Sequence, residues 1–186
     1  MKKNSENNTN SKKSSSPSSK IENLQARKSE AKLGGGAERQ EAQQKKGKKL
    51  ARERLSLLFD NGKFTEIDPF VKHNSSDFGL DKTRKDGDSV ICGYGSVHGQ
   101  QVFAFSQDFT VLGGSLSKVA SNKICKVFDL AIKTGCPIVG INDSGGARIQ
   151  EGVDSLSGYG ELFKRNTMAS GVIPQITVVV GPSAGG

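Results

Sequence analysis

The chain has 186 residues, with 27 Lys+Arg against 19 Asp+Glu and a formal net charge of +8. No run of residues approaches the roughly 18 consecutive apolar side chains that a membrane-spanning helix needs, which excludes helical membrane-spanning proteins. The 3 cysteines have no ligand-type spacing, which argues against a metal module or a disulfide scaffold and predicts free thiols in a reducing compartment.

The basic charge belongs to the N-terminal third of the chain. Residues 1–63 carry 16 Lys/Arg and 7 Asp/Glu, a net charge of +9, which leaves −1 for residues 64–186. Residues 1–37 begin with a stretch rich in Ser, Asn and Lys, and we expect them to form a disordered basic leader. A basic leader is able to touch nucleic acid or an acidic membrane surface, but a solvated tail is the simpler interpretation.

Met1 is followed by polar and charged residues rather than by an apolar run, so we expect no secretory signal. A mitochondrial transit peptide is disfavoured by the absence of Arg before Arg27 and by the presence of Glu6. The sequence therefore predicts a cytoplasmic protein, with the mitochondrial matrix as the alternative in a eukaryote.

Between residues 50 and 108 we expect helical and then β structure. Asp60-Asn61-Gly62 should end the helix, and Gly99 can supply the positive φ of a tight hairpin turn. We expect an amphipathic helix over Leu50–Leu58 and a short strand over Phe64–Asp68. A long polar loop, His73–Asp86, should follow, and then a β-hairpin formed by Asp88–Val97 and Gln101–Asp108.

Beyond residue 115 the pattern alternates between helix and strand. Ser115 or Ser117 is a good N-cap for a helix whose apolar side chains keep to one face, and Gly135 is a typical stop. A strand from Pro137, a helix from about Val153 and a strand from Pro174 follow. Alternation with short links implies right-handed crossovers and a parallel sheet, so the fold class is α/β.

Two glycine-rich loops follow the two predicted parallel strands, at Ser144–Ala147 and at Gly181–Gly186. Either loop alone is equally well explained as an ordinary turn between a strand and a helix. Consecutive parallel strands can end near each other, so the two loops together predict backbone N–H groups that converge on one oxygen and stabilise a developing negative charge.

Two rival sites are less consistent with these residues. Gly181-Pro182-Ser183-Ala184-Gly185 formally fits the Gly-x-Ser-x-Gly elbow of serine hydrolases, but the only histidines are His73 in a polar loop and His98 in a hairpin turn. A phosphate-binding loop is disfavoured because no Gly-Lys-Ser/Thr follows either glycine run.

Charged residues flank the first loop. Arg148 is able to meet a phosphate or carboxylate, but a pair with Glu151 or Asp143 would simply brace the loop, and Asp143 is placed to cap the N–H groups of the loop. The basic segment Lys45–Arg54 is able to reach an anionic cofactor tail, although a solvated helix face is the simpler interpretation.

The sequence resembles the biotin-dependent acyl-CoA carboxyltransferases, of the propionyl-CoA carboxylase beta-chain type, over roughly residues 38–186. The segments that carry the resemblance are Ala51–Leu55, Asp86–Val90, Phe105–Leu116, Asn142–Gly152, Ser170–Ile176 and Gly181–Gly186. The family usually has Cys where this chain has Ser183, a small-for-small change that should leave the backbone donors intact.

The resemblance implies a crotonase-like fold, a spiral of ββα units, with residues 38–186 forming the first part of an N-terminal carboxyltransferase domain. It implies transfer of a carboxyl group from carboxybiotin, carried by a partner protein or domain, to the α-carbon of a short-chain acyl-CoA such as propionyl-CoA or acetyl-CoA. It also implies a homo-hexamer in full-length relatives, a biotin carboxylase or biotin carrier partner, and no metal. By motif match the catalytic N–H donors are Gly185 and Gly186, and the coenzyme A side is lined by Gly145, Gly146, Ala147 and Arg148.

Two other functions stay open. One is the carboxyltransferase subunit of a biotin-dependent decarboxylase of the methylmalonyl-CoA type, which has a membrane partner. The other is a non-catalytic nucleic-acid-binding or scaffold protein that uses the basic leader, whereas the carboxylase hypothesis involves neither nucleic acid nor membrane. Because Gly185-Gly186 looks like a loop at the start of a helix, we expect the chain to be an N-terminal fragment that is inactive by itself.

Overall fold

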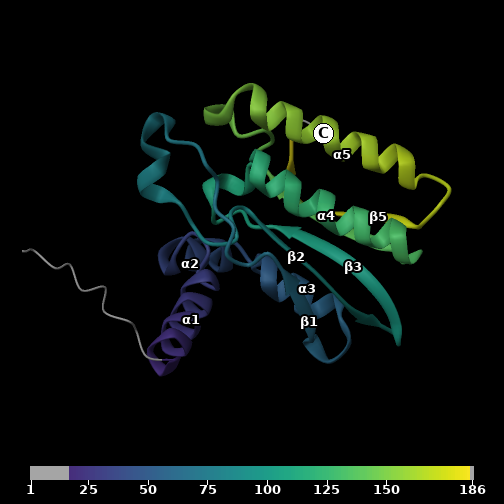
Figure 1. The fold of residues 1–186 in the computed structure, drawn as a ribbon, viewed down its shortest axis with the longest axis horizontal. Helices are drawn as coiled ribbons and strands as arrows, with labels where there is room; N and C mark the ends of the chain where they lie inside the picture. Colours follow the sequence, from purple (N-terminus) through teal and green to yellow (C-terminus); the bar gives the residue numbers. More distant parts are fainter. Residues whose placement is uncertain (1–16, 185–186) are drawn as a thin grey trace, which may run out of the picture.

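The computed structural model describes residues 17–184 of the chain (Figure 1). Its helices and strands, in chain order, are α1 (Pro17–Ala31), α2 (Ala37–Lys45), α3 (Ala51–Leu58), β1 (Phe64–Ile67), β2 (Val90–Val97), β3 (Gln100–Gln107), α4 (Lys118–Thr134), β4 (Ile138–Ser144), α5 (Val153–Ala169) and β5 (Gln175–Ser183). No helix among these is long and apolar enough to cross a membrane.

The five strands form one mixed sheet in the order β1-β2-β3-β4-β5. β1, β2 and β3 pair antiparallel, whereas β3, β4 and β5 run parallel to one another. The predicted hairpin and the predicted parallel arrangement are both confirmed. The turn between β2 and β3 consists of His98 and Gly99, whose φ angles of 50° and 78° are those of a tight type I′ hairpin turn.

Helix α4 begins and ends at the predicted capping residues. The Ser117 hydroxyl accepts a hydrogen bond from the N–H of Ala120 at 2.8 Å, so Ser117 rather than Ser115 is the N-cap. Gly135 ends the helix with a φ of 68°, a left-handed conformation that a side chain disfavours. These local signals fix the ends of the helix whose first turn packs beside the glycine loops.

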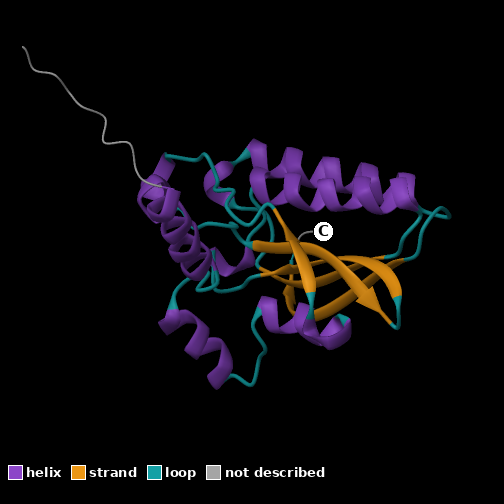
Figure 2. Cartoon of the chain, turned by 60° about the horizontal axis from the view of Figure 1, so that its bottom comes forward, coloured by secondary structure: helices purple, strands orange, loops and turns teal. Residues whose placement is uncertain are grey.

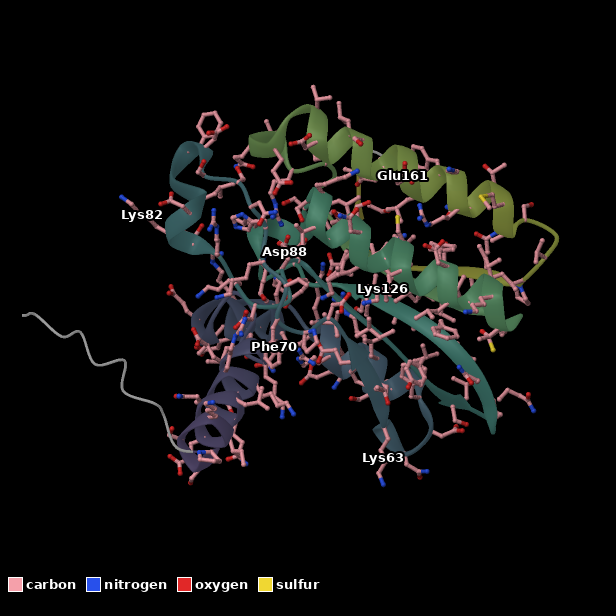
Figure 3. All side chains as sticks on the ribbon, in the orientation of Figure 1. Lys63, Phe70, Lys82, Asp88, Lys126 and Glu161 are labelled. Atoms are coloured by element: carbon pink, nitrogen blue, oxygen red, sulfur yellow. The ribbon has the colours of Figure 1, made fainter. Side chains whose placement is uncertain are left out.

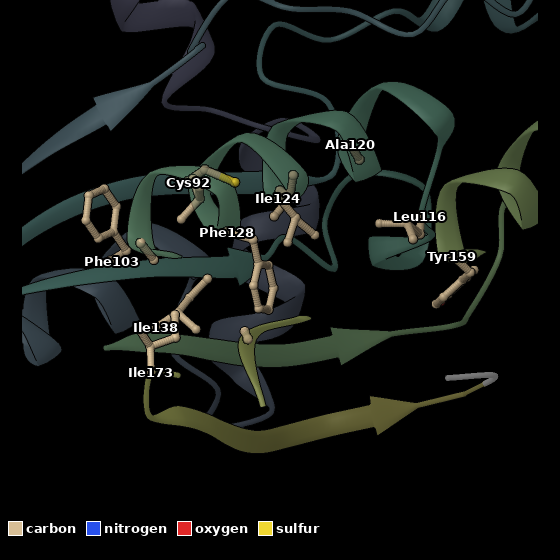
Figure 4. Packing of buried hydrophobic residues seen from close by; sticks show 13 residues of the cluster. Cys92, Phe103, Leu116, Ala120, Ile124, Phe128, Ile138, Tyr159 and Ile173 are labelled. Carbon is tan, nitrogen blue, oxygen red and sulfur yellow. The ribbon is translucent and has the colours of Figure 1, made fainter. Parts of the chain in front are cut away.

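Helices cover both faces of the sheet (Figure 2). α4 and α5 lie on one face, where they bury a cluster that includes Phe103, Ile124, Phe128 and Ile138 (Figure 4). α3 covers the other face and packs Leu55 against the sheet. Phe103 belongs to the first cluster and its neighbours Val102 and Ala104 to the second, as expected for a strand covered on both faces. Burying each large apolar side chain contributes about 1.5–3 kcal/mol.

Several apolar side chains of α5 and β5 are exposed in the part of the chain that the structure describes. Leu156 and Met168 of α5 are 61% and 58% exposed, and Ile176 and Val179 of β5 are 51% and 60% exposed. β5 pairs with β4 along one edge, and no other described strand pairs with its second edge.

The leader contains a helix where disorder was predicted. Residues 17–31 form α1, so the predicted disorder of residues 1–37 is wrong for this helix, and residues 1–16 lie outside the described part. Arg27 of α1 forms two hydrogen bonds with Asp86, at 2.8 and 2.9 Å, and stacks 4.6 Å above the ring centre of Phe70. These contacts join α1 to the segment that leads into the hairpin. The domain boundary at residues 37 and 38 stays a prediction.

The turn between α1 and α2 packs directly against the loop that follows β3. The N–H of Gly35 donates to the Thr110 hydroxyl at 3.0 Å. A Cβ atom at Gly35 would lie 1.9 Å from the carbonyl oxygen of Thr110, so this contact requires glycine.

The long loop predicted at residues 73–86 contains a 3₁₀ helix, Asp77–Thr83, which the absence of a clear periodicity did not indicate. It contacts the short 3₁₀ turn Ile149–Glu151 that follows the first glycine loop. The segment therefore lies beside the turn that follows the glycine loop, with Leu80 buried and Phe78 86% exposed.

Candidate functional site

The two glycine-rich loops lie side by side at the carboxyl ends of β4 and β5. Ser144 and Ser183 are paired across the two strands, and the N–H of Ala184 donates to the Ser144 carbonyl at 3.2 Å. A Cβ atom at Gly146 would lie 3.0 Å from the Ala184 carbonyl oxygen, and Gly146 has a φ of 102°. The two loops lie together as predicted, whereas the convergence of their N–H groups on one oxygen stays a prediction. Gly146 is glycine for both steric and conformational reasons.

Both glycine N–H groups of the first loop already have acceptors. Gly145 donates to the Gly113 carbonyl at 2.9 Å, and Gly146 donates to the Ser144 hydroxyl at 3.0 Å. Within residues 17–184, the N–H of Ala147 has no acceptor, and Ala147 itself is half-buried. Ala147 is therefore the loop residue that best fits an N–H donor to a ligand oxygen.

Backbone hydrogen bonds hold this loop against the start of α4. Leu116 donates to the Gly146 carbonyl, and Arg148 donates to the Leu116 carbonyl, each at 2.9 Å. Gly114 packs so closely behind the loop that a Cβ atom there would lie 2.2 Å from the Asp143 carbonyl oxygen. The position of Ala147 is thus fixed from both sides by main-chain contacts.

Arg148 is a buried brace. Its side chain has 0% exposure and forms a two-bond ion pair with Asp88, at 2.7 and 3.2 Å (Asp88 is labelled in Figure 3). Its remaining N–H groups donate to Glu151, Ser89 and Ser115. A fully paired, buried guanidinium cannot also meet an anionic cofactor, so we reassign Arg148 from binding to positioning.

The same network reaches the start of α4. The Ser117 hydroxyl donates to Asp88, and a Glu151 carboxylate oxygen accepts from the N–H of Lys118 at 2.8 Å. Arg148 and Asp88 therefore join the hairpin, the helix cap and the glycine loop into one buried cluster. The pairing of Arg148 with Asp88 could not be predicted from the sequence, because the two residues lie 60 positions apart.

Asp143 does not cap the loop, contrary to expectation. Its carboxylate, fully buried, accepts from Arg54 at 2.7 Å and from Lys48 at 3.2 and 3.4 Å, while the Ser144 hydroxyl provides the cap. The expectation that residues 45–54 form a solvated face is therefore wrong for Lys48 and Arg54. Their distance from Asp143 along the chain, 95 and 89 positions, hid the contact.

A cavity of about 310 Å³ lies between the sheet, α4 and α5. Its polar end, formed by Asn142, Ser144 and Ser183, adjoins the two loops, and its apolar end includes Phe128 and Ile138. Part of its lining belongs to the core cluster, whereas Phe163 and Ile176 of the lining are half exposed. Ala147 is not among the lining residues, so the cavity lies beside the loops but does not include the Ala147 donor.

The histidines do not form a serine-hydrolase site with Ser183. His73 is buried, its two ring nitrogens have no hydrogen-bond partner in the described part of the chain, and burial lowers its pKa. His98 lies in the hairpin turn, at the opposite end of the parallel strands from Ser183. Neither histidine is hydrogen-bonded to Ser183 within residues 17–184, so the general base that this hydrolase needs is not provided there.

Of the six residues assigned from motifs, Gly185 and Gly186 lie outside the described residues. Gly145, Gly146 and Ala147 lie together at the converging loops, and their role in binding stays a prediction. Within residues 17–184, no group of three or more His, Cys, Asp and Glu side chains is arranged to hold a metal ion.

Comparisons with known proteins agree with the resemblance. The carboxyl transferase domain family matches residues 42–186. A propionyl-CoA carboxylase beta chain from Roseobacter denitrificans is 57% identical over 166 residues, which are 89% of this chain and 32% of that protein. The methylmalonyl-CoA decarboxylase subunit alpha of Propionigenium modestum is 56% identical over 167 residues, 90% of this chain and 32% of that protein.

A solved structure of transcarboxylase 12S, a hexamer with methylmalonyl-coenzyme A bound, superposes with a TM-score of 0.90 at 46% identity, covering 92% of this chain and 34% of that one. This likeness agrees with the expected crotonase-like α/β fold. The alignment of 166 residues is longer than the segment 38–186, so the similarity extends into the leader, contrary to expectation. The chain spans about a third of the length of these relatives.

Proposed function

Because the chain belongs to the carboxyl transferase domain family, we propose that it supplies the acyl-CoA-binding loops of a biotin-dependent acyl-CoA carboxyltransferase. The observation that carries this proposal is the N–H of Ala147, which has no acceptor in the described chain and follows two glycines whose N–H groups are engaged. Such a donor suits the thioester oxygen of an acyl-CoA, where negative charge develops when the α-carbon loses its proton.

In the proposed reaction the α-carbon of the thioester would exchange its proton for a carboxyl group and form a C–C bond. Biotin, held by a partner protein, would supply the activated carboxyl group, and its urea nitrogen would take up the proton in exchange. Ala147 would stabilise the thioester oxygen together with the N–H groups assigned by motif to Gly185 and Gly186. Gly145 and Gly146 would give the ligand close access to the backbone, and Arg148 would hold the loop in place.

The acyl group is proposed to be short, such as propionyl or acetyl, in line with the names of the relatives. The same similarity supports a second candidate, the reverse direction in a methylmalonyl-CoA decarboxylase, because 56% identity to the Propionigenium modestum subunit hardly differs from 57% to the carboxylase chain. A homo-hexamer and a biotin-carrying partner belong to the proposal as well.

The proposed compartment is the cytoplasm, or the mitochondrial matrix. Support for the second compartment comes from a beta chain of Mus musculus that is named as mitochondrial and is 56% identical over 174 residues.

A hybrid enzyme tests the function. Residues 42–186 replace the matching segment of the Roseobacter denitrificans beta chain, and carboxylation of propionyl-CoA is measured with the biotin-carrying partner of that organism. We expect activity within about tenfold of the parent enzyme. A folded hybrid of normal oligomeric state that transfers no carboxyl group would refute the proposal.

A backbone change tests the donor. Replacing Ala147 by its α-hydroxy acid, through semisynthesis, converts the N–H into an ester oxygen and keeps the side chain. We expect kcat to fall about 10²–10³-fold, the usual cost of losing one donor to an oxyanion. The Ala147→Gly hybrid, which keeps the N–H, is the matched control and should retain most activity. An ester hybrid as active as the control would contradict the assignment of Ala147.

A further inference from the structure

The ion cluster of Asp143, Lys48 and Arg54 lies where the two functional loops leave the sheet. Asp143 directly precedes Ser144, the first residue of the first loop, and its side chain has 0% exposure. Lys48 and Arg54, at 26% and 10% exposure, approach it from the segment that leads into α3 and from α3 itself. A buried carboxylate with two cationic partners is held in one place, because separating it from them would leave an uncompensated charge.

The second loop passes directly over this cluster. A Cβ atom at Gly181 of β5 would lie 1.9 Å from an Asp143 carboxylate oxygen and 2.6 Å from the Lys48 ammonium nitrogen. The backbone of β5 therefore contacts the ion pair without a side chain between them. Any movement of the Asp143 carboxylate is transmitted to β5 at Gly181.

The pairing of β4 with β5 becomes irregular at the same position. Asn142 is paired with Val179, and the next pair is Ser144 with Ser183. A step of two residues along β4 thus corresponds to a step of four residues along β5. β5 therefore forms a bulge between Val179 and Ser183, beside Asp143. The bulge decides which residue of the second loop lies opposite Ser144.

We propose that Asp143, held by Lys48 and Arg54, is a positioning residue that sets this bulge and thereby the spacing of the two glycine loops. The N–H of Ala184, which donates to the Ser144 carbonyl at 3.2 Å, marks the correct spacing. The catalytic part of this inference rests on the proposed function, because the loops hold the thioester oxygen there. The structural part depends only on the fold.

Hydrogen exchange tests the structural part. The amide exchange rate of Ala184 is compared between the parent and the variants Asp143→Asn and Lys48→Met. The comparison is made both in the 186-residue chain and in the hybrid enzyme. Lys48→Met leaves the Asp143–Arg54 pair in place and is the variant more certain to fold. We expect Ala184 to exchange at least about tenfold faster in both variants, while Val139 and Ile141 in the regular part of β4 keep their protection.

Kinetics test the catalytic part in the hybrid enzyme. A displacement of about 1 Å at a reacting group can lower the rate about 10²-fold. We therefore expect kcat per CoA-binding site to fall about 10- to 100-fold in Asp143→Asn, with the KM for propionyl-CoA changed less than about threefold. A purely structural role would lower the number of binding sites and leave kcat per site unchanged.

Arg52→Met is the matched control, because Arg52 also lies on α3 but pairs with Glu66, away from the loops. It should change neither Ala184 exchange nor kcat. Unchanged Ala184 exchange in both cluster variants overturns the inference. An inactive parent hybrid with accelerated Ala184 exchange in the variants rejects the proposed function and keeps the positioning role of Asp143.

Discussion

Replacing Arg148 by methionine should destabilise the protein more than any other single change at the site. Methionine fills much of the same space, but it leaves the Asp88 carboxylate buried with only the Ser117 hydroxyl as a donor. It also removes the hydrogen bonds to Ser89, Ser115 and Glu151. The change thus isolates the cost of an unpaired buried charge.

The expected loss in the free energy of unfolding is about 3–5 kcal/mol, the range for removing one partner of a buried ion pair. Domains of this size lose about 2–4 °C in Tm per kcal/mol, so the midpoint should fall by roughly 6–20 °C. Urea denaturation followed by circular dichroism, on the 186-residue chain and on the hybrid enzyme, measures the free energy directly.

The matched control is Arg165→Met. Arg165 also pairs with two carboxylates, Asp129 and Glu161, each at 2.8 Å, but these are 56% and 46% exposed. We expect this variant to lose only about 0.2–1 kcal/mol, because solvent screens the pair. The double variant Asp88→Asn with Arg148→Met should lose at least about 2 kcal/mol less than the sum of the single variants. Equal losses at Arg148 and Arg165, or additive behaviour in the double variant, would refute the argument.

Three further predictions follow from single contacts. Gly181→Ala should lower the free energy of unfolding by about 1–3 kcal/mol in urea denaturation, because its Cβ would overlap Asp143, whereas Gly160→Ala, where nothing lies within 4 Å, should not destabilise. Gly35→Ala should undock the turn between α1 and α2, seen as faster proteolysis after Arg27, because its Cβ would lie 1.9 Å from the Thr110 oxygen. Burial lowers the pKa of His73, so the unfolded chain binds more protons and stability should fall as pH drops below about 6.5. His73→Leu should show a smaller loss than the parent between pH 6.5 and 5, and an identical pH dependence would argue against this role.

Features that depend on neighbouring residues could be predicted from the sequence. The type I′ turn needs only His98-Gly99 between two strands, and the caps of α4 need only Ser117 and Gly135. The parallel strands and the convergence of their loops followed from the alternation of helices and strands.

Features that depend on distant partners could not be predicted. Nothing near Arg148 in the sequence indicates that Asp88 neutralises it, and nothing near Asp143 indicates Lys48 and Arg54. The contact of Arg27 in α1 with Asp86 likewise spans 59 positions. The Gly145 N–H donates to the Gly113 carbonyl, and this bond leaves Ala147 as the donor without an acceptor. It depends on how the segment before α4 packs against the loop, which the sequence does not indicate.

The uncovered strand β5 has a practical consequence for work with the 186-residue chain. Among residues 17–184 no strand pairs with its second edge, and Ile176 and Val179 on this strand are more than half exposed. An edge of this kind can recruit a strand from another molecule, so the chain should self-associate as its concentration rises. β5 should therefore limit the solubility of the chain. A charged side chain on this strand, as in Val179→Lys, should keep the chain monomeric at higher concentration, which light scattering measures.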